Sequence, residues 1–90
     1  MGNVNDNIRH RGYRVRYQKL GRRKAVGLCD WDNKEILIDE RQTARNKLDT
    51  IVHEHLHRMH PDWSEKQVAK EATDLASALW KMGYRMVELS

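Results

Sequence analysis

Cysteine, proline and phenylalanine are nearly missing from this 90-residue chain, which has one, one and none of them. The single cysteine, Cys29, excludes an intramolecular disulfide framework and is typical of proteins that stay in a reducing cytosol. With one proline and no Gly/Ser-rich stretch, the chain carries no sign of a linker between domains. Residues 1–11 are polar and predict a flexible N-terminal arm. Residues 12–90 then predict a single domain.

Long apolar runs are missing as well. No stretch approaches the roughly 20 apolar residues of a membrane-spanning helix, and no secretory signal opens the chain. The sequence therefore predicts a cytoplasmic protein without membrane contact. Its hydrophobic content of 39% gives only a small core. A bound metal would contribute materially to the stability of so small a fold.

Positive charge is concentrated at the start of the chain, within a net charge of +4. Asp6 is the only acid in the first quarter, whereas its basic residues are Arg9, Arg11, Arg14, Arg16, Lys19, Arg22, Arg23 and Lys24. Such a block predicts either a solvated sheet face or a weak contact with nucleic acid or an acidic protein. The residues expected at a nucleic-acid contact are Arg14, Arg16, Arg22, Arg23 and Lys24. No recognition helix or stacking aromatic row accompanies them, which favours the solvated face.

Three short strands are expected after the arm. Tyr13, Val15 and Tyr17 alternate with arginines, a pattern that predicts a half-buried strand. Residues 25–29 predict a second strand, and residues 35–39 (EILID) predict an apolar third one. Turn formers separate the strands, so the sequence predicts a three-stranded antiparallel meander.

Two helices are expected after the strands. The first has apolar residues at three- and four-residue steps, namely Leu48, Ile51, Val52, Leu56 and Met59. A capping box can open the second, formed either by Asp62 with Glu65 or by Ser64 with Gln67. The apolar face of the second helix consists of Val68, Ala72, Leu75, Ala76 and Leu79. The order of elements predicts an α+β fold in which a small antiparallel sheet packs on a helical hairpin.

The most specific pattern is His53-Glu54-His55-Leu56-His57, an HExxH motif on the first predicted helix. Residues four apart lie one above the other at about 6 Å, so His53 and His57 can reach one Zn²⁺ at roughly 2.0–2.1 Å. Glu54 follows the first ligand and can act as a base toward a metal-bound water. The competing interpretation is a polar helix flank without metal. Both histidines lie beside the apolar stripe, where unpartnered imidazoles are unfavourable, and this favours the metal.

Zinc needs a third protein ligand. His55 lies about 200° around the helix from His53 and faces elsewhere. His60 is about 10.5 Å further along the helix axis than His53, too far for one metal to bridge both. The second helix must therefore supply the ligand.

A helical hairpin brings one glutamate of the second helix level with the histidines. If the chain folds back around Asp62, Glu71 becomes level with His53, and its side chain leans toward the midpoint of the histidine pair. Glu65 lies too near the turn in this geometry. The sequence thus predicts zinc as cofactor, with the metal ligands His53, His57 and Glu71.

The motif and the following glutamate resemble the gluzincin metallopeptidases. More narrowly, DTIVHEHLHRMH…EKQVAKEATDLASALWKMGYR is similar to the small ImmA/IrrE-type and SprT-like zinc peptidases of phages and bacteria. The similarity covers about residues 13–83 and implies a minimal zincin-like fold. It also implies that Glu54 is the general base beside a zinc ion held by His53, His57 and Glu71. This chain is shorter than typical members, and only Tyr84 or Arg85 stands where an oxyanion-stabilising residue would be sought.

These features lead to three hypotheses about function. The first is a zinc-dependent peptidase that cleaves a cytosolic protein or peptide, with Glu54 taking a proton from the metal-bound water. In that case residues 34–40 form either the rim of the cleft or merely a core strand. The second is a zinc-stabilised, catalytically idle module that contacts nucleic acid or protein through the basic first quarter. The third is a metal-free interaction protein. Glu54 favours the first, because a purely structural zinc site needs no base beside its first ligand.

Overall fold

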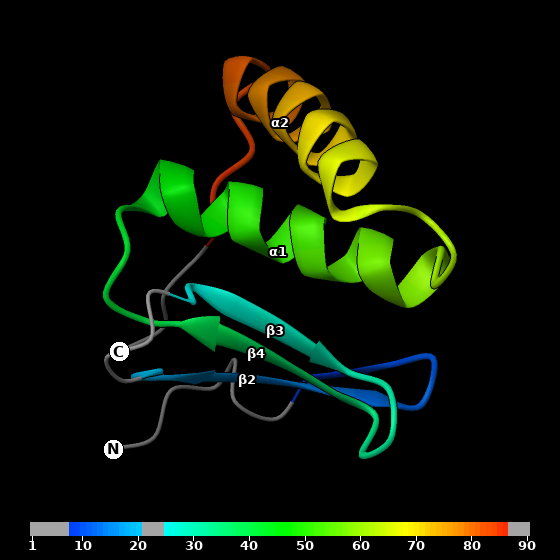
Figure 1. Ribbon diagram of the computed structural model, residues 1–90. Helices are drawn as coiled ribbons and strands as arrows, with labels where there is room; N and C mark the ends of the chain where they lie inside the picture. Colours follow the sequence, from blue (N-terminus) through cyan, green and yellow to red (C-terminus); the bar gives the residue numbers. More distant parts are fainter. Residues whose placement is uncertain (1–7, 21–24, 87–90) are drawn as a thin grey trace.

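A computed structural model describes residues 8–20 and 25–86 of the chain. The sheet, helix α1 (Ala44–Met59) and helix α2 (Glu65–Lys81) are stacked in that order, so that α1 lies between the sheet and α2 (Figure 1). The predicted α+β class and the helical hairpin are confirmed. None of the helices in the described residues is both long and apolar enough to cross a membrane.

The sheet differs from the prediction in strand number and in direction. It contains β1 (Ile8–His10), β2 (Tyr13–Gln18), β3 (Gly27–Asp30) and β4 (Glu35–Asp39), in the spatial order β1-β2-β4-β3. The pairs β1–β2 and β3–β4 are antiparallel, whereas β2 and β4 run parallel. The predicted three-stranded antiparallel meander is therefore wrong, and the sheet is four-stranded and mixed.

The apolar strand β4 takes the central position that the meander would have given to β3. Ile36 and Ile38 of β4 are completely buried, and Ile36 is the register partner of Val15 on one side and of Cys29 on the other. A strand at the centre of a sheet removes more apolar surface from water than a strand at the edge. The two inward apolar side chains of β4 therefore favour the central position. The hypothesis that residues 34–40 form a cleft rim is thereby corrected, because β3 occupies the edge.

The first strand lies within the residues for which the sequence predicts an arm. Ile8–His10 pair with β2 through a tight turn, in which Arg11 and Gly12 have φ angles of 54° and 83°. Positive φ at two successive turn residues is the conformation that joins strands of the usual twist, and glycine adopts it readily. The Arg11-Gly12 pair was the available signal for this hairpin. Residues 1–7 of the predicted arm lie outside the described part of the chain.

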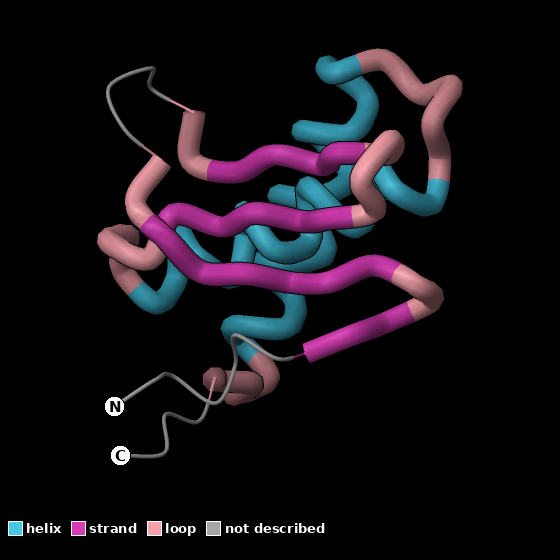
Figure 2. The backbone as a smooth tube through the Cα atoms, turned by 90° about the horizontal axis from the view of Figure 1, so that it is seen from below, coloured by secondary structure: helices cyan, strands magenta, loops and turns pink. Residues whose placement is uncertain are grey.

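Alternation along the strands separates a core face from an open face. Val15, Cys29, Ile36 and Ile38 form one cluster beneath α1, and Ile51 of the helix packs against it. The opposite face of the sheet is not covered by either helix (Figure 2). In the described part of the chain, the helices thus cover one side of the sheet only. Inward-pointing side chains of the strands face α1 on that side.

The second helix begins where one of the two predicted capping boxes places it. The backbone N–H of Gln67 donates to Ser64 Oγ at 3.1 Å, and Ser64 has the extended conformation of an N-cap. Glu65 consequently occupies the first helical turn, with its carboxylate available for other contacts. The cap therefore fixes where Glu65 stands relative to α1.

Candidate metal centre

Two histidines and one glutamate meet between α1 and the first turn of α2. His53 Nε2 lies 2.8 Å from Glu65 Oε2, and His57 Nε2 lies 2.7 Å from Glu65 Oε1. The two imidazole rings are neighbours, with centroids 5.0 Å apart. Both histidine side chains are largely buried, whereas 69% of the Glu65 side chain is exposed. Three groups that bind metals through nitrogen or carboxylate oxygen therefore converge on one point.

The spacing of these groups fits a tetrahedral metal site. One donor atom from each residue can be chosen so that all three lie within 4.8 Å of one another. Donors at about 2.0 Å from a tetrahedral zinc ion lie roughly 3.3 Å apart. The Glu65 oxygens are closer to the imidazoles than that, but Glu65 is exposed and can withdraw by a few tenths of an ångström. The donor set, two imidazoles and a carboxylate, suits zinc and leaves a fourth position for water.

Of the two glutamates, the structure brings Glu65 and not the predicted Glu71 next to the histidines, and the reason is helical phase. Glu65, Val68 and Ala72 stand at i, i+3 and i+7 and share one face of α2, on which Val68 and Ala72 are fully buried. Glu71 precedes Ala72 and points about 100° away from that face. The prediction of Glu71 used only the position of a residue along the helix axis. The direction of the side chain around that axis brings Glu65 to the histidines instead. The buried stripe of α2 was visible in the sequence and could have shown this.

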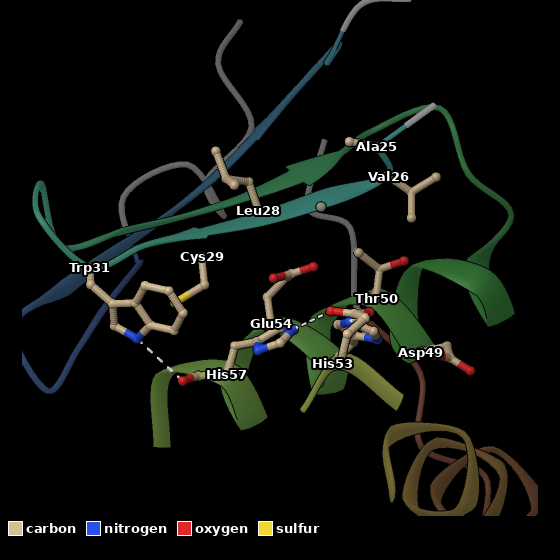
Figure 3. A pocket seen from close by; sticks show the side chains of 12 residues that line it. Ala25, Val26, Leu28, Cys29, Trp31, Asp49, Thr50, His53, Glu54 and His57 are labelled. Carbon is tan, nitrogen blue, oxygen red and sulfur yellow. Dashed lines mark hydrogen bonds and ion pairs between the residues drawn. The ribbon is translucent and has the colours of Figure 1, made fainter. Parts of the chain in front are cut away.

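Glu54 is a buried carboxyl group beside the first histidine. Only 7% of the residue is exposed, and its side chain points from α1 toward β3 (Figure 3). Burial is the main cause that raises the pKa of Glu54 above its ordinary value. The negative charge of Glu65 adds to this increase, while His53 and His57 oppose it. A carboxyl group with a raised pKa next to potential metal ligands is suited to accepting a proton near neutral pH.

Gly27 makes room for the Glu54 carboxyl group. A Cβ atom on Gly27 would lie 2.9 Å from both Cγ and Oε2 of Glu54 and 2.6 Å from the Thr50 methyl group. These separations are below ordinary van der Waals contact, so only glycine fits without a shift of the Thr50 and Glu54 side chains or of α1. The backbone of β3 and the Glu54 side chain are therefore in direct contact.

The remaining histidines of the motif region face other neighbours. His60 stacks on Trp63, with ring centroids 3.8 Å apart. His55 lies edge-on to His10, at 6.1 Å between centroids. Burial, together with the charge of Arg58, lowers the pKa of His55 to about 4. As the helical geometry predicts, His55 and His60 stand apart from the pair His53 and His57.

A cavity of about 420 Å³ opens between β3 and α1 at these groups. Its lining combines the candidate metal ligands and Glu54 with apolar residues of β3 and its flanking loops. Trp31 stands at one end, where its indole N–H donates to the His57 carbonyl oxygen at 3.2 Å (Figure 3). Cys29 also lines the cavity, and burial raises the pKa of its thiol to about 11. The raised pKa disfavours the thiolate, the form of cysteine that acts as a nucleophile and as a metal ligand.

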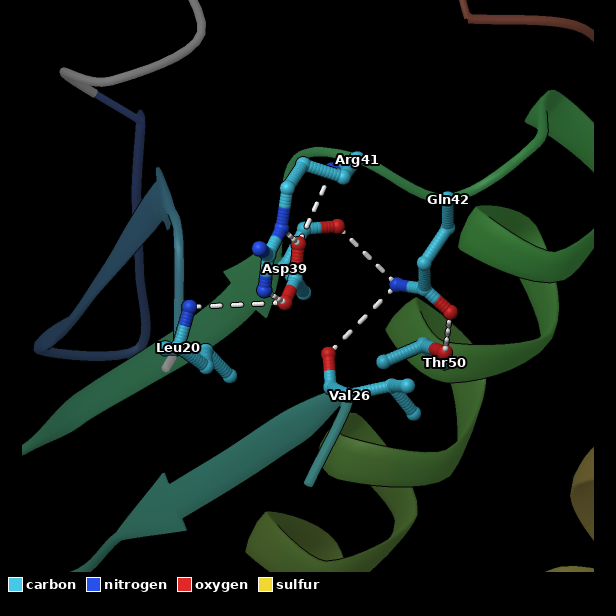
Figure 4. Close-up of polar contacts among 6 residues, drawn as sticks. All are labelled: Leu20, Val26, Asp39, Arg41, Gln42 and Thr50. Carbon is cyan, nitrogen blue, oxygen red and sulfur yellow. Dashed lines mark hydrogen bonds and ion pairs between the residues drawn. The ribbon is translucent and has the colours of Figure 1, made fainter. Parts of the chain in front are cut away.

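A separate polar network fixes the loop that leads into α1. Arg41 binds Asp39 through its side chain at 2.7 and 3.0 Å, and the Leu20 N–H donates to the same carboxylate (Figure 4). The Arg41 side chain holds the pKa of Asp39 well below its usual range. Gln42 donates to the Asp39 carbonyl at 3.0 Å and accepts from the Thr50 hydroxyl at 2.8 Å. This network ties the end of β4 to α1 one turn before Glu54.

Tyr84 and Arg85, the two residues considered for oxyanion stabilisation, lie elsewhere. They line a different hollow of about 790 Å³, together with Leu48, Ile51 and Trp80. Arg85 stacks over the Trp80 ring at 3.4 Å. Among the described residues that line the cavity at β3 there is no tyrosine, lysine or arginine.

The basic residues of the first quarter are only partly within the described chain. Arg9 and Arg14 are direct cross-strand partners on β1 and β2, and Arg16 forms an ion pair with Glu35 at 3.4 Å. Three of the residues expected at a nucleic-acid contact lie outside the described part, namely Arg22, Arg23 and Lys24.

Comparisons with protein-family models, with curated proteins and with solved structures gave no match to this chain.

Proposed function

We propose that this protein is a zinc-dependent peptidase of the gluzincin type, in which His53, His57 and Glu65 hold the metal. The observation that carries the proposal is the convergence of these three donors on one side of a cavity that also contains Glu54. A structural metal site requires donors alone. The buried carboxyl group of Glu54, at the residue next to His53, adds the base that hydrolysis requires.

In this reaction the metal would polarise the substrate carbonyl and lower the pKa of a bound water. Glu54 accepts the proton of the attacking water and delivers it to the leaving nitrogen. Its raised pKa brings it nearer to the pH at which both transfers are efficient. The described lining residues include no tyrosine, lysine or arginine, so stabilisation of the oxyanion would fall to a metal held by His53, His57 and Glu65 and to backbone N–H groups.

The edge strand β3 offers a place for the substrate chain. β3 pairs with β4 on one side only, and its residues Gly27, Leu28 and Cys29 line the cavity. An extended peptide can add to such an edge through main-chain hydrogen bonds, which fixes its carbonyl groups relative to α1. The proposed substrate is therefore an unfolded segment or an extended loop of a cytosolic protein.

The metal assignment is tested with a matched pair of glutamate variants. Zinc content and zinc affinity are measured for the wild type, Glu65→Ala and Glu71→Ala. We expect one zinc per wild-type chain, a loss of affinity of at least about a hundredfold in Glu65→Ala, and a change within a few-fold in Glu71→Ala. The opposite order of the two variants would return the ligand role to Glu71. Stoichiometric zinc in a His53→Ala/His57→Ala double variant would remove the metal centre altogether.

A second candidate function, an idle module that contacts nucleic acid, is favoured by one observation. Arg9 and Arg14 are opposite each other on neighbouring strands, and no ion pair of either is found among the described residues. Like charges in this position destabilise a sheet, and a bound polyanion would relieve the repulsion. Retardation of RNA or DNA at low salt that disappears in Arg9→Ala/Arg14→Ala would support it. Zinc-dependent cleavage that Glu54→Gln abolishes would show that the module is not idle.

A further inference from the structure

The second hollow, which Tyr84 and Arg85 line, lies next to the strands that α1 covers least. α1 packs on β3 and β4, and α2 packs on α1 (Figure 1). A helix about 10 Å across covers roughly two strands that are spaced about 4.8 Å apart, so one helix is too narrow for a sheet of four strands. The inner side of β1 and β2 therefore has little helix above it. The hollow at this place has a volume of about 790 Å³.

The walls of the second hollow are mostly apolar. They come from the sheet edge, from α1 and from the end of α2, and they include Ile8, Tyr17, Leu48, Ile51, Leu79 and Trp80. Ile8 is 42% exposed, and Leu48 and Leu79 are only partly buried, although both belong to the apolar stripes of their helices. Binding sites for small molecules have a volume and an apolar lining of this kind, with a few polar groups at defined places.

The charged residues in the described lining of this hollow are both cationic. They are Lys47 and Arg85, and no aspartate or glutamate stands with them. Neither cation has an ion pair among the residues that the structure describes. The cavity at β3 is the reverse, because its described lining has three carboxyl groups and no lysine or arginine. A free anion is therefore more favourable in the second hollow than in the cavity at β3.

Arg85 is already held in place for such an anion. Its guanidinium group lies 3.4 Å over the Trp80 ring, and its Nη1 donates to the carbonyl oxygens of Trp80 and Tyr84 at 3.0 and 2.9 Å. A guanidinium group has five N–H donors, and Nε and Nη2 of Arg85 have no acceptor within the described part of the chain. Donors along one edge of a fixed guanidinium group match the two oxygens of a carboxylate.

From this lining and this charge we infer that the second hollow is a binding site for a small amphiphilic carboxylate of the fatty-acid class. Apart from Gln42 and two tyrosine hydroxyls, the uncharged part of the described lining has no polar side chain, so the body of the ligand is apolar. The hydrocarbon chain lies against Leu48 and Ile51, and Arg85 and Lys47 bind the carboxylate. The hollow shares no described lining residue with the cavity at β3, and the inference does not rest on the proposed peptidase function.

The first test varies the ligand and leaves the protein unchanged. The full chain is titrated calorimetrically with hexanoate, octanoate, decanoate and decan-1-ol, each below the concentration at which micelles form. Affinity should rise by about fourfold for each added methylene group that is buried. Decan-1-ol has the chain without the charge and should bind at least about tenfold more weakly than decanoate. Equal affinities of decanoate and decan-1-ol, or no saturable binding of decanoate, would overturn the inference.

Matched variants test the two cations. Lys47→Ala/Arg85→Ala should weaken the binding of decanoate by at least about tenfold and change the affinity for decan-1-ol by less than about twofold. The control is Lys66→Ala/Lys70→Ala, which removes two positive charges from exposed positions of α2 outside both hollows. It should leave the affinity for decanoate within about twofold of the wild type. An equal loss in both double variants would reveal an effect of net charge and contradict the inference.

Nuclear magnetic resonance locates the ligand. On addition of decanoate the indole N–H signal of Trp80 should shift, because this ring lines the second hollow, whereas the signal of Trp31 at the other cavity should stay. Trp31→Phe and Trp80→Phe assign the two signals. A shift of Trp31 alone would place the carboxylate at the candidate metal centre and refute the inference. Glu65→Ala should bind decanoate like the wild type, so that a failure of the metal proposal and a failure of this inference are observed separately.

Discussion

Two polar clusters of this protein, both on or beside α1, are arranged in opposite ways. Around Asp39 and Arg41, donors and acceptors of the protein pair with one another, and the carboxylate receives N–H groups from Arg41 and Leu20. Around His53 and His57, both imidazoles direct Nε2 at the same exposed glutamate. The first arrangement is complete within the chain. In the second arrangement, two imidazoles share the carboxylate group of a single residue, Glu65.

The difference separates a polar group that fixes structure from one that is suited to a ligand. A closed network such as that of Asp39 stabilises the loop it belongs to, because each buried polar atom has a partner. A converging set whose members are all metal-binding types is more favourable with an ion at its centre. Burial does not distinguish the two clusters, since Asp39 and Glu54 are almost equally buried. The two clusters differ in the direction of their side chains, which pair with one another around Asp39 but converge on Glu65 around His53 and His57.

The largest expected effect lies in the converging cluster. Glu54→Gln should lower the rate of peptide hydrolysis by about 10²–10⁴-fold, because it removes the base and keeps the volume of the side chain. Zinc content and melting temperature should stay near those of the wild type. The control is Glu71→Gln, which changes a glutamate of α2 outside the cavity. Wild-type turnover by Glu54→Gln would exclude Glu54 as the base.

Gly27→Ala should disturb the same region through a steric clash, without changing any charge. Its new methyl group would meet Glu54 and Thr50 at 2.9 and 2.6 Å, so these side chains or the backbone of α1 must shift. We expect a loss of about 1–3 kcal/mol in the free energy of unfolding, measured by urea denaturation. Leu28→Ala, at the next residue of β3, removes a half-exposed side chain and should cost less. An unchanged stability of Gly27→Ala would show that the contact between β3 and α1 is looser than described.

Asp39→Asn should lower stability without changing zinc content, whereas Glu54→Gln should change only the rate of hydrolysis. We expect the melting temperature at pH 7 to fall by about 5–10 °C, as for other breaks in buried hydrogen-bonded networks. The pKa of Asp39 is depressed in the folded state, so its stabilising contribution is present above about pH 4 and is lost as the pH falls below that value. The difference between wild type and variant should therefore shrink in thermal melts from pH 5 to pH 3. A pH-independent difference would contradict the ionic role of Asp39.

The smallest effect is expected at Thr50, which connects the two clusters. Thr50→Val removes the hydroxyl that donates to Gln42 and keeps the methyl group that faces Gly27. We expect a loss of about 0.5–1 kcal/mol in stability and no change in zinc affinity. Thr73→Val serves as the comparison, because its hydroxyl bond to Asp49 is longer and exposed. A fall in zinc affinity in Thr50→Val would mean that the closed network positions the metal ligands.

Local patterns in the sequence predicted the helices well. They predicted poorly which strands pair, because strand pairing joins residues that are far apart in sequence. The histidine helix, its partner helix and the Ser64 cap follow from spacing and from capping chemistry, which act within a few residues. The parallel pairing of β2 with β4 could not be read in this way. It depends on which strand is buried on both sides, and that choice is made by the whole sheet. The Arg11-Gly12 turn was a readable signal for β1, although a polar strand of three residues has little other pattern.

The candidate site shows the same division between local and distant information. His53, Glu54 and His57 come from one motif on one helix, so their mutual geometry follows from helical periodicity. The third ligand depends on how α2 is rotated about its axis when it packs on α1. The argument from level along the hairpin favoured Glu71 and placed Glu65 too near the turn, but it left out this rotation, and in the structure Glu65 contacts both histidines. No motif marks Trp31, because its contact with His57 comes from a turn that packs against the end of α1.

The edge position of β3 also bears on the order in which the chain assembles. β3 and β4 are joined by a tight turn of four residues, 31–34, so their pairing is local in sequence. The parallel pair is different, since Arg16 and Glu35 are 19 positions apart with β3 between them. Closing that larger loop costs more chain entropy and comes more slowly than closing a hairpin. The hairpin of β3 and β4 can therefore form early, whereas its pairing with β2 and its contact with α1, in which Trp31 and His57 are 26 positions apart, belong to later steps.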